Sequence, residues 1–547
     1  MHCRRFPRRG EVRMLSRAVT AQLPVWMALL GVLAAVSVVA PRIPLPLPVT
    51  IALAGVLVGF LPGVAELPFD PNLVLVLFLP PLLYADAFGT SWLDFRRWLR
   101  PILMLAIGLV LVTVLVVGLV AKWALPELPW AACFILGAIV SPTDTVAVQA
   151  VIERLHIPRR ITAIVGGESL VNDATGLVGV QIGVAVALSG VFEVGGVAVD
   201  FLRVAGLGVL IGVAVGWLAV LANRRIADVP TLFVLSLTAP YLAYFVAAWA
   251  NASGVLAVVI AGFFAAWRIH VLRGEARVQL YVSWGLFVYV LNGLCFAFVG
   301  MHTPSLLRSF AQADRRELLA AGLAVSAAVI AVRVLWCFPN AYWPVLVSPA
   351  LRRREGGLPT WRGVTIVSWC GARGAVSLAA ALSLPVTLAD GAPFPGRTEI
   401  LACTLCVILV TLFVQASTLS PLIRLLGLRA DEDTAVEVRH ARETVLQAGI
   451  NRLDAYCSQA SCPLAVHHLR TLMDDELTAL RSADAEARHH AEARLAVSND
   501  VRREVGIAQE RALLALRDGG AINDRTYTAL QLELDRASFD AAGRALA

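Results

Sequence analysis

Lysine is almost absent from this chain, and charged residues of any kind are few. Lys122 is the single lysine among 547 residues, and only 16% of the residues are charged. A nucleotide-binding loop of the Gly-x-x-x-x-Gly-Lys-Ser/Thr type requires a lysine, and Lys122 does not stand in one. We therefore do not expect an ATP-driven pump with its own motor domain.

The low charge comes with a high apolar content. Soluble domains carry roughly 25% charged residues, whereas here hydrophobic residues reach 58% and the mean hydropathy is +0.74. Such a chain is an integral membrane protein. Its net charge of +7 lies mostly in short basic runs between apolar segments, where it sets membrane topology. We therefore expect the lipid bilayer as a partner and no nucleic acid.

The cysteines do not form the pattern of a disulfide framework. All nine are scattered, most of them in apolar segments, as small buried side chains often are. Near the C-terminus, Cys457, Cys462, His467 and His468 could bind zinc, but their spacing fits no standard zinc finger. Histidines there could also sense pH. A solvated helical face is the preferred interpretation, so we expect no resident cofactor.

Thirteen apolar segments have about the ~20-residue length that crosses a bilayer. A proline-rich stretch, residues 41–48, leaves the first boundaries open, so that twelve or fourteen helices also fit. The expected helices cover residues 22–40, 45–63, 72–89, 101–120, 130–151, 161–188, 204–222, 231–249, 253–267, 281–301, 317–337, 363–384 and 399–425.

Arginines in alternate loops predict the topology. One set of loops is rich in arginine, whereas the other carries few basic residues and several acids. By the positive-inside rule the arginine-rich set faces the cytoplasm, which places the C-terminus inside and the N-terminus outside. Six arginines within the first 21 residues favour the opposite placement of the N-terminus, but the summed bias of the loops outweighs them. The apolar run that follows is longer than a signal-peptide core, so we interpret it as a helix.

Composition divides the chain into three parts. A basic N-terminal segment, residues 1–21, precedes a transmembrane domain over residues 22–426. From residue 427 to residue 547, alanine, arginine and acidic residues recur with helical periodicity. This last part is predicted to be a helical cytoplasmic C-terminal domain.

Two expected helices contain residues that a regular transmembrane helix avoids. The fifth holds Ser141-Pro142-Thr143-Asp144-Thr145, in which the proline removes a backbone donor. The twelfth holds Gly371-Ala372-Arg373-Gly374. Both should be locally unwound. Each is the fifth helix of a block of six, the first block being helices one to six and the second helices eight to thirteen. Because the two helices are an odd number of helices apart, seven, they cross the membrane in opposite senses.

This arrangement predicts two inverted six-helix repeats with crossed broken helices. Asp144 and Arg373 would lie near the crossing, at the middle of the bilayer. The alternative, in which the proline and the glycines only kink packed helices, leaves these two matched charges unexplained. The predicted fold is therefore an all-α polytopic membrane protein with about 13 transmembrane helices.

The sixth expected helix carries two acids inside an apolar segment, where acids usually handle ions or protons. Ser169 and Asp173 are four residues apart and share a helix face, whereas Glu168 points about 140° away from Asp173 at ~100° per residue. The oxygens of the face that Ser169 and Asp173 share, together with oxygens of the fifth helix, can form a site for a small hard cation. Its ligands would be Asp173, Ser169, Thr143 and Asp144.

Glu168 and Asn172 are predicted to have structural roles. Glu168 would pair with Arg373, so that each charge makes the other tolerable in a dry interior. Asn172 would hydrogen-bond the unwound backbone of the broken helices. A direct role of Glu168 in transport is the alternative.

A carboxylate such as Asp173 can hold either a proton or a metal cation. Burial disfavours its charged form, whereas a bound cation favours that form, so the two ligands compete for one group. If the site opens to only one side of the membrane at a time, this competition alone exchanges a cation for a proton. Such a protein needs no covalent chemistry and is not expected to be an enzyme.

Four motifs carry a family resemblance. They are Leu79-Pro80-Pro81-Leu82-Leu83, Ser141-Pro142-Thr143-Asp144, Gly167-Glu168-Ser169-Leu170-Val171-Asn172-Asp173 and Gly371-Ala372-Arg373-Gly374-Ala375-Val376-Ser377. Together and in this order they resemble the monovalent cation:proton antiporter family, of the bacterial NhaP and animal sodium/proton exchanger type. The resemblance implies a thirteen-helix homodimer in the bacterial plasma membrane, with a dimerisation domain and a core that moves like an elevator.

The resemblance also implies a function and marks some departures. Family members exchange Na+ or K+ for H+, and the pair Asn172 and Asp173 implies electroneutral exchange. The chain departs from the family at Gly166, where glutamate is common, and at Ala372, where a larger apolar residue is common. In the third helix the acid comes one position later than in many relatives, at Asp86, which leaves open whether it faces the site.

Three other functions fit parts of the sequence. A cation channel would pass ions without a counter-moving proton. A non-transporting membrane sensor would use the C-terminal domain as its output and pass no ions. Asp144 and Asp173 could also be the catalytic pair of an intramembrane aspartyl protease, but the Gly-x-Gly-Asp pattern expected around one of the acids is missing from the sequence.

Overall fold

The computed structural model describes residues 27–43, 45–61, 71–155, 157–189, 194–223, 226, 228–269, 272, 274–309, 315–355, 357–387, 393–428, 432–459, 464–481, 485–518 and 530. The chain divides into two compact units, Met1–Ala430 and Asp431–Ala547, and each is described by itself. The predicted basic segment, residues 1–21, lies outside the described residues.

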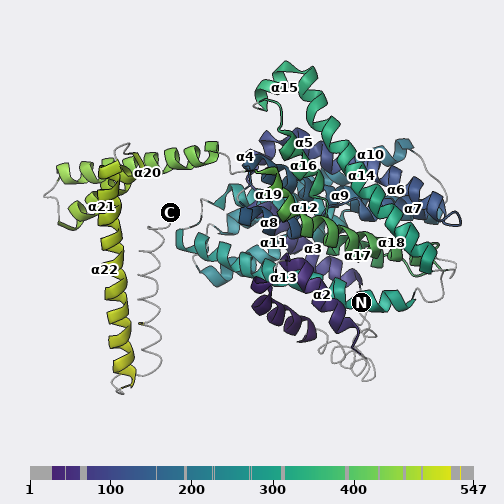
Figure 1. Ribbon diagram of the computed structural model, residues 1–547, viewed down its shortest axis with the longest axis horizontal. Helices are drawn as coiled ribbons and strands as arrows, with labels where there is room; N and C mark the ends of the chain where they lie inside the picture. Colours follow the sequence, from purple (N-terminus) through teal and green to yellow (C-terminus); the bar gives the residue numbers. More distant parts are fainter. Residues whose placement is uncertain are drawn as a thin grey trace, which may run out of the picture. The chain divides into compact units, whose positions relative to one another are not determined.

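The first unit is built from helices (Figure 1). Among the described residues, seven helices are long and apolar enough to cross a membrane, and five shorter apolar helices accompany them. An isolated β-bridge joins Thr387 and Pro393. The all-α membrane fold is therefore confirmed, whereas the count of thirteen crossings and the inverted repeats stay predictions.

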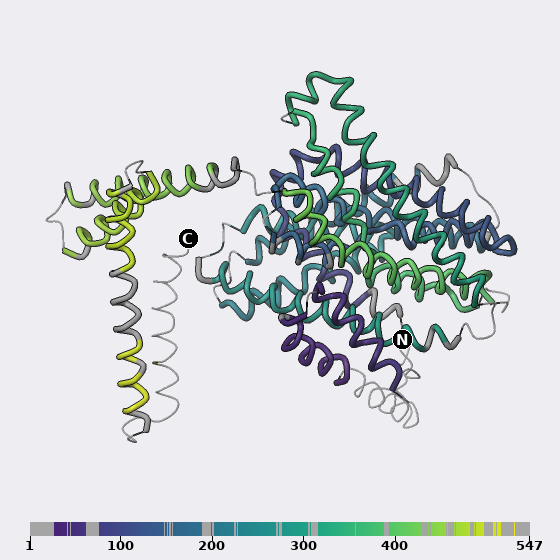
Figure 2. The backbone as a smooth tube through the Cα atoms, viewed as in Figure 1, coloured from purple at the N-terminus to yellow at the C-terminus, as the bar shows by residue number. Residues whose placement is uncertain are grey.

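The helices follow the order that the apolar segments predict. The chain path in Figure 2 runs from purple through teal to green across this unit. Its first half contains a helix over Met27–Val39, then η1 (Ala40–Arg42), α2 (Leu47–Gly59), α3 (Pro71–Gly89), α4 (Trp92–Arg97), α5 (Leu99–Leu103), η2 (Met104–Leu109), α6 (Val110–Ala124), α7 (Trp130–Val140), α8 (Val146–Leu155) and α9 (Arg159–Ser189).

The second half of this unit is also helical. It contains α10 (Val194–Asn223), α11 (Val229–Trp249), α12 (Gly254–Trp267), α13 (Gly274–Ser309), α14 (Arg315–Val347), α15 (Pro349–Arg354), α16 (Trp361–Trp369), α17 (Ala375–Leu382), α18 (Arg397–Val410), η5 (Thr411–Ala416) and α19 (Ser417–Leu426). The segments η2 and η5 are single π-helical turns inside longer helices, a feature that is frequent at functional sites.

Side-chain caps fix where several of these helices begin. Asp228, Ser253 and Thr360 each accept a hydrogen bond from a backbone N–H three residues later, at 3.1 to 3.3 Å. Such bonds satisfy N–H groups that have no partner within the helix. Hydrogen bonds from the hydroxyl and the N–H of Thr231 also hold the pKa of the exposed Asp228 carboxyl below its ordinary value.

The helices α2 and α13 pack unusually closely. A Cβ atom built on Gly55 would lie 2.4 Å from the carbonyl oxygen of Ala297, and one on Gly59 would lie 2.3 Å from that of Met301. Gly300 of α13 approaches Ala52 of α2 in the same way. Small residues at four-residue spacing let transmembrane helices come this close, so that backbone contacts hold the pair together.

Both predicted helix breaks are confirmed. The helix α7 ends at Val140 and α8 starts at Val146, so residues 141–145 are not helical. In the second half, α16 ends at Trp369 and α17 starts at Ala375, which leaves residues 370–374 unwound.

The second unit contains α20 (Glu432–Gln459), α21 (Leu464–Arg481) and α22 (Ala485–Asp518). The helix α21 packs against both of the others. Asp475 of α21 is 6% exposed and accepts hydrogen bonds from Nε of Arg494 in α22 at 3.0 and 3.1 Å. Hydrogen bonding to this carboxylate raises the pKa of Arg494.

The possible zinc ligands of this unit do not form a metal site among the described residues. No group of three or more metal-binding side chains is found in the part of the chain that the structure describes. Cys457 takes part in a disulfide and is not a free thiolate ligand. Cys462 lies outside the described residues.

Candidate cation site at the helix crossing

The two unwound segments, residues 141–145 and 370–374, cross inside the first unit. The backbone N–H of Asp144 donates to the carbonyl of Ala372 at 2.8 Å, which joins the segments directly. Gly374 allows this approach, because a Cβ atom built there would lie 1.5 Å from Oδ2 of Asp144. Any residue can adopt its φ of -134°, so the position needs glycine because a side chain would collide with Asp144 and not because of the backbone conformation.

Asp144 stabilises the two half-helices that begin at the crossing. Its Oδ1 accepts a hydrogen bond from the N–H of Val146 at 2.9 Å, and its carboxylate also accepts one from the N–H of Ala375. These two residues open α8 and α17. Because a helix N-terminus carries partial positive charge on its unpaired N–H groups, one carboxylate stabilises both starts.

Arg373 stabilises the two half-helices that end at the crossing. It is 1% exposed, and its Nε donates to the carbonyl of Val140 at 2.8 Å. The guanidinium also donates to the carbonyls of Gly371 and Ser141. Since the last carbonyls of a helix carry partial negative charge, the arginine balances the ends of α7 and α16.

The predicted ion pair between Glu168 and Arg373 is wrong. Glu168 is 1% exposed and pairs instead with Arg333 of α14, at 2.5 Å from Nη1 to Oε1 and 2.8 Å from Nη2 to Oε2. Arg333 is 0% exposed and also donates to the carbonyl of Val367 at 3.0 Å. Arg373 donates its hydrogen bonds to carbonyls at the helix ends, and Arg333 pairs with Glu168 in its place. The sequence did contain an indication of this pair, because Arg333 is a charged residue inside the expected helix 317–337.

Thr143 connects the broken helix to α9. Its hydroxyl donates to Oε1 of Glu168 at 3.2 Å and accepts from Nδ2 of Asn172 at 2.8 Å. Its carbonyl accepts from the hydroxyl of Ser169 at 3.2 Å. Asn172 was predicted to bond the unwound backbone and in fact bonds the side chain of an unwound residue. The hydroxyl of Thr143 is therefore already used within the protein.

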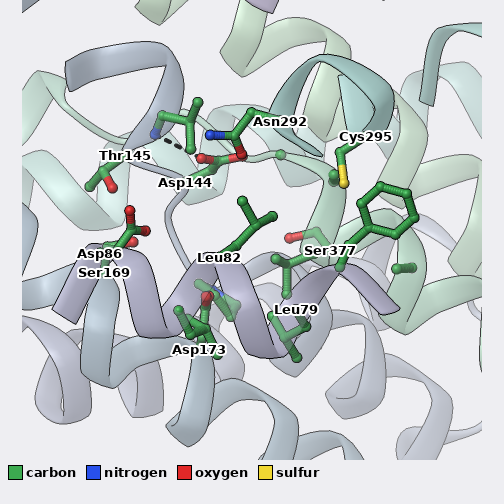
Figure 3. A pocket seen from close by; sticks show the side chains of 18 of the residues that line it. Leu79, Leu82, Asp86, Asp144, Thr145, Ser169, Asp173, Asn292, Cys295 and Ser377 are labelled. Atoms are coloured by element: carbon green, nitrogen blue, oxygen red, sulfur yellow. Dashed lines mark hydrogen bonds between the residues drawn. The ribbon is translucent and has the colours of Figure 1, made fainter. Parts of the chain in front are cut away.

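A cavity of about 60 Å³ lies beside the crossing (Figure 3). It brings together all four predicted cation ligands, Thr143, Asp144, Ser169 and Asp173. Asp173 is 6% exposed, and its carboxylate has no hydrogen bond or ion pair among the described residues. Glu168 does not line the cavity, so the two acids of α9 face different ways, as their spacing predicts.

Several cavity residues were missed or left open by the sequence. Asp86 of α3 lines the cavity, which settles the open question of where it faces. Asn292 of α13, Ser377 of α17 and Thr145 add further oxygen atoms to the walls, as Figure 3 shows. Asn292 could have been suspected, because it is a polar residue inside the apolar segment 281–301.

Comparison with known proteins agrees with this arrangement. The family model described as sodium/hydrogen exchanger, transmembrane, matches residues 27–425. An uncharacterised Na+/H+ exchanger of Mycobacterium tuberculosis is 34% identical over 500 residues, which are 88% of this chain and 89% of that protein. A sodium, potassium, lithium and rubidium/H+ antiporter of Bacillus pumilus is 33% identical over 76% of this chain and 62% of its own length.

A solved structure shows the same fold. The sodium proton antiporter MjNhaP1 of Methanocaldococcus jannaschii aligns with a TM-score of 0.58 at 20% sequence identity. The alignment covers 75% of this chain and 99% of that protein. The family match, the relatives and the crossed helices around buried carboxylates lead to one conclusion. The chain belongs to the sodium/hydrogen exchanger family of membrane transporters.

Proposed function

We propose that this chain exchanges Na+, or K+ or Li+, for H+ across the membrane, with cation and proton competing for Asp173. The names of its relatives support this exchange, since they are described as Na+/H+ exchangers or as antiporters of several alkali cations. The site supports it independently, because oxygen atoms are the ligands that hard cations prefer.

The state of Asp173 is the observation that carries the proposal. Of the four acids at or beside the crossing, Asp144 is bound to helix N-termini, Glu168 is bound to Arg333, and Asp86 is only half-buried. Asp173 faces the cavity without a bonding partner among the described residues. A buried carboxylate without a partner is costly unless it binds a proton or a cation. It is therefore the group on which the two ligands compete.

The cavity suits a small cation that keeps part of its water shell. A buried water needs roughly 10–15 Å³ of such space, and the cavity offers about 60 Å³. The carboxylates of Asp144 and Asp173 and the hydroxyl of Ser169 are the available ligands. Thr143 contributes mainly by holding α9 against the unwound segment, since its hydroxyl is already bonded.

The remaining features of the proposal come from the family resemblance. Asn172 next to Asp173 supports electroneutral exchange of one proton per cation. The transporter would be a homodimer in the bacterial plasma membrane, with a core that moves relative to a dimerisation domain. Arginine-rich loops support a cytoplasmic location of the C-terminal unit. No resident cofactor and no enzymatic step are part of this mechanism.

Transport by purified protein tests the proposal. In proteoliposomes with an internal pH dye, each alkali cation is added in turn, and Na+ addition should move protons in the wild type. The Asp173→Asn variant should lose this flux while keeping its folded size-exclusion profile. An imposed membrane potential should leave the wild-type rate unchanged if one proton moves per cation.

Each other outcome has a defined meaning. Full exchange by Asp173→Asn would remove Asp173 from the mechanism. Cation flux without proton movement would favour the channel alternative, and a folded wild type without any flux would favour the sensor. The control variant Asp228→Asn removes one exposed acid outside the cavity, keeps a good helix cap, and should transport like the wild type.

A further inference from the structure

A second cavity, of about 290 Å³, lies next to the first. We name it the vestibule. Its walls are rich in polar side chains from α3, α4, α8, α9, the link between α3 and α4, and the unwound segment 141–145. Among them are Asp86, Thr90, Ser91, Asp94, Thr145, Gln149, Arg159 and Thr162. A space of this size and polarity can hold many waters, so a cation can enter it with its hydration shell largely intact.

Two residues line both cavities. Asp86 and Thr145 belong to the walls of the vestibule and also to those of the cavity that contains Asp173. Asp86 is only half-buried, unlike Asp173. A cation that passes from the vestibule to Asp173 therefore meets Asp86 on its way.

The acids of the vestibule differ in their partners. Asp94 is paired with Arg159, with 2.8 Å between Oδ2 and Nε, so its charge is balanced. The carboxylate of Asp86 has no hydrogen bond or ion pair among the described residues. The uncompensated negative charge of the vestibule therefore lies at its inner end, next to the narrow cavity.

We propose that Asp86 is a cation-transfer residue, which draws the cation out of the vestibule and passes it to Asp173. The inference rests on the proposed exchange function and adds a step to it. A cation that enters the smaller cavity loses waters, and a carboxylate at the boundary replaces them with oxygen ligands. Asp86 thus affects the rate and the apparent affinity with which the cation reaches the site, whereas Asp173 is the group that exchanges the cation for a proton.

The position of Asp86 predicts an effect on one side of the membrane. Asp86 belongs to α3, whereas Asp144 belongs to the unwound segment at the crossing and Asp173 to α9. Asp94 and Arg159 also line the vestibule, and they flank loops that the positive-inside rule places in the cytoplasm. Transfer through Asp86 therefore serves cations that arrive from the cytoplasmic face.

Membrane vesicles of opposite orientation test this step with full-length protein. Everted vesicles expose the cytoplasmic face to added Na+, and right-side-out vesicles expose the other face. Asp86→Asn should raise the apparent KM for Na+ about fivefold in everted vesicles, the factor expected for a contact between unit charges in water. In right-side-out vesicles the KM should stay at the wild-type value. Asp86→Glu keeps the charge and should lie close to the wild type in both.

Other results would overturn the proposal. An unchanged KM on both faces would show that Asp86 takes no part, and an equal rise on both faces would assign it to the central site. Complete loss of exchange by folded Asp86→Asn would also assign Asp86 to the central site. Size-exclusion chromatography identifies misfolded protein, and Asp228→Asn controls for the loss of one acid on the cytoplasmic side. Failure of the exchange function itself is distinguishable, because the wild type would then move no protons.

Discussion

Arg333 shows, at the scale of single residues, how a buried charge can be assigned to the wrong partner. The sequence offers three arginines inside expected transmembrane helices of the second half, Arg333, Arg373 and, at the end of the last one, Arg424, and only Arg373 stands in a motif. Glu168 was therefore predicted to pair with Arg373, the arginine of the motif. In the structure the backbone carbonyls at the crossing occupy Arg373, and Arg333 reaches Glu168 from α14. Helical spacing fixed which way Glu168 faces, but not which helix lies opposite it.

The first prediction concerns this ion pair. Arg333→Leu should destabilise the protein by ~3–5 kcal/mol, because it leaves Glu168 charged and unpaired in a dry interior. Adding Glu168→Gln should restore much of the loss. Thermal unfolding of purified protein in detergent measures both effects. The same rescue should fail for Arg373→Leu, and a rescue there would contradict the pairing seen in the structure.

The broken helices are the elements that create the site. The sequence predicted both breaks from Pro142 and from the glycines around Arg373, since proline removes a backbone donor and glycine weakens a helix. It also placed Ser169 and Asp173 on one face. It could not place Asp86 or Asn292, because a helix's rotation about its own axis depends on packing that a short motif does not encode. Helix order was therefore predictable, and the walls of the cavity were only partly so.

Gly374 gives a prediction at the scale of the elements. Gly374→Ala would put a Cβ atom 1.5 Å from Oδ2 of Asp144, so the two unwound segments must move apart. Overpacking of this kind costs ~1–3 kcal/mol, and it displaces a proposed cation ligand. Proton flux in proteoliposomes should fall strongly. Gly285→Ala, where no atom lies within 4 Å of the added Cβ, is the matched control and should transport normally.

The whole molecule consists of two units, and all the site residues belong to the first. The cavity, the vestibule and the ion pair of Glu168 and Arg333 lie before Ala430. The second unit has its own internal contacts, including the pair Asp475 and Arg494. Composition predicted a separate helical part from residue 427, and its role as a cytoplasmic domain stays a prediction.

This division predicts the effect of truncation. A chain that ends at Ala430 should keep cation-dependent proton flux per folded molecule, because it retains every residue of the proposed site. Proteoliposome assays of both chains at several pH values measure the flux. A change in pH profile with the maximal rate retained would assign regulation to the second unit. Loss of flux from folded truncated protein would contradict the independence of the site.

The balanced charges at the crossing have a consequence for leakage. Asp144 and Arg373 oppose the partial charges of helix ends, and Glu168 is cancelled by Arg333. An ionised Asp173 without a bound ion therefore adds an uncompensated negative charge to this region. Carrying such a charge through a low-dielectric barrier costs several kcal/mol, and a proton or an alkali ion removes that cost. We expect the empty carrier to reorient rarely, so that electrostatics alone suppresses slippage.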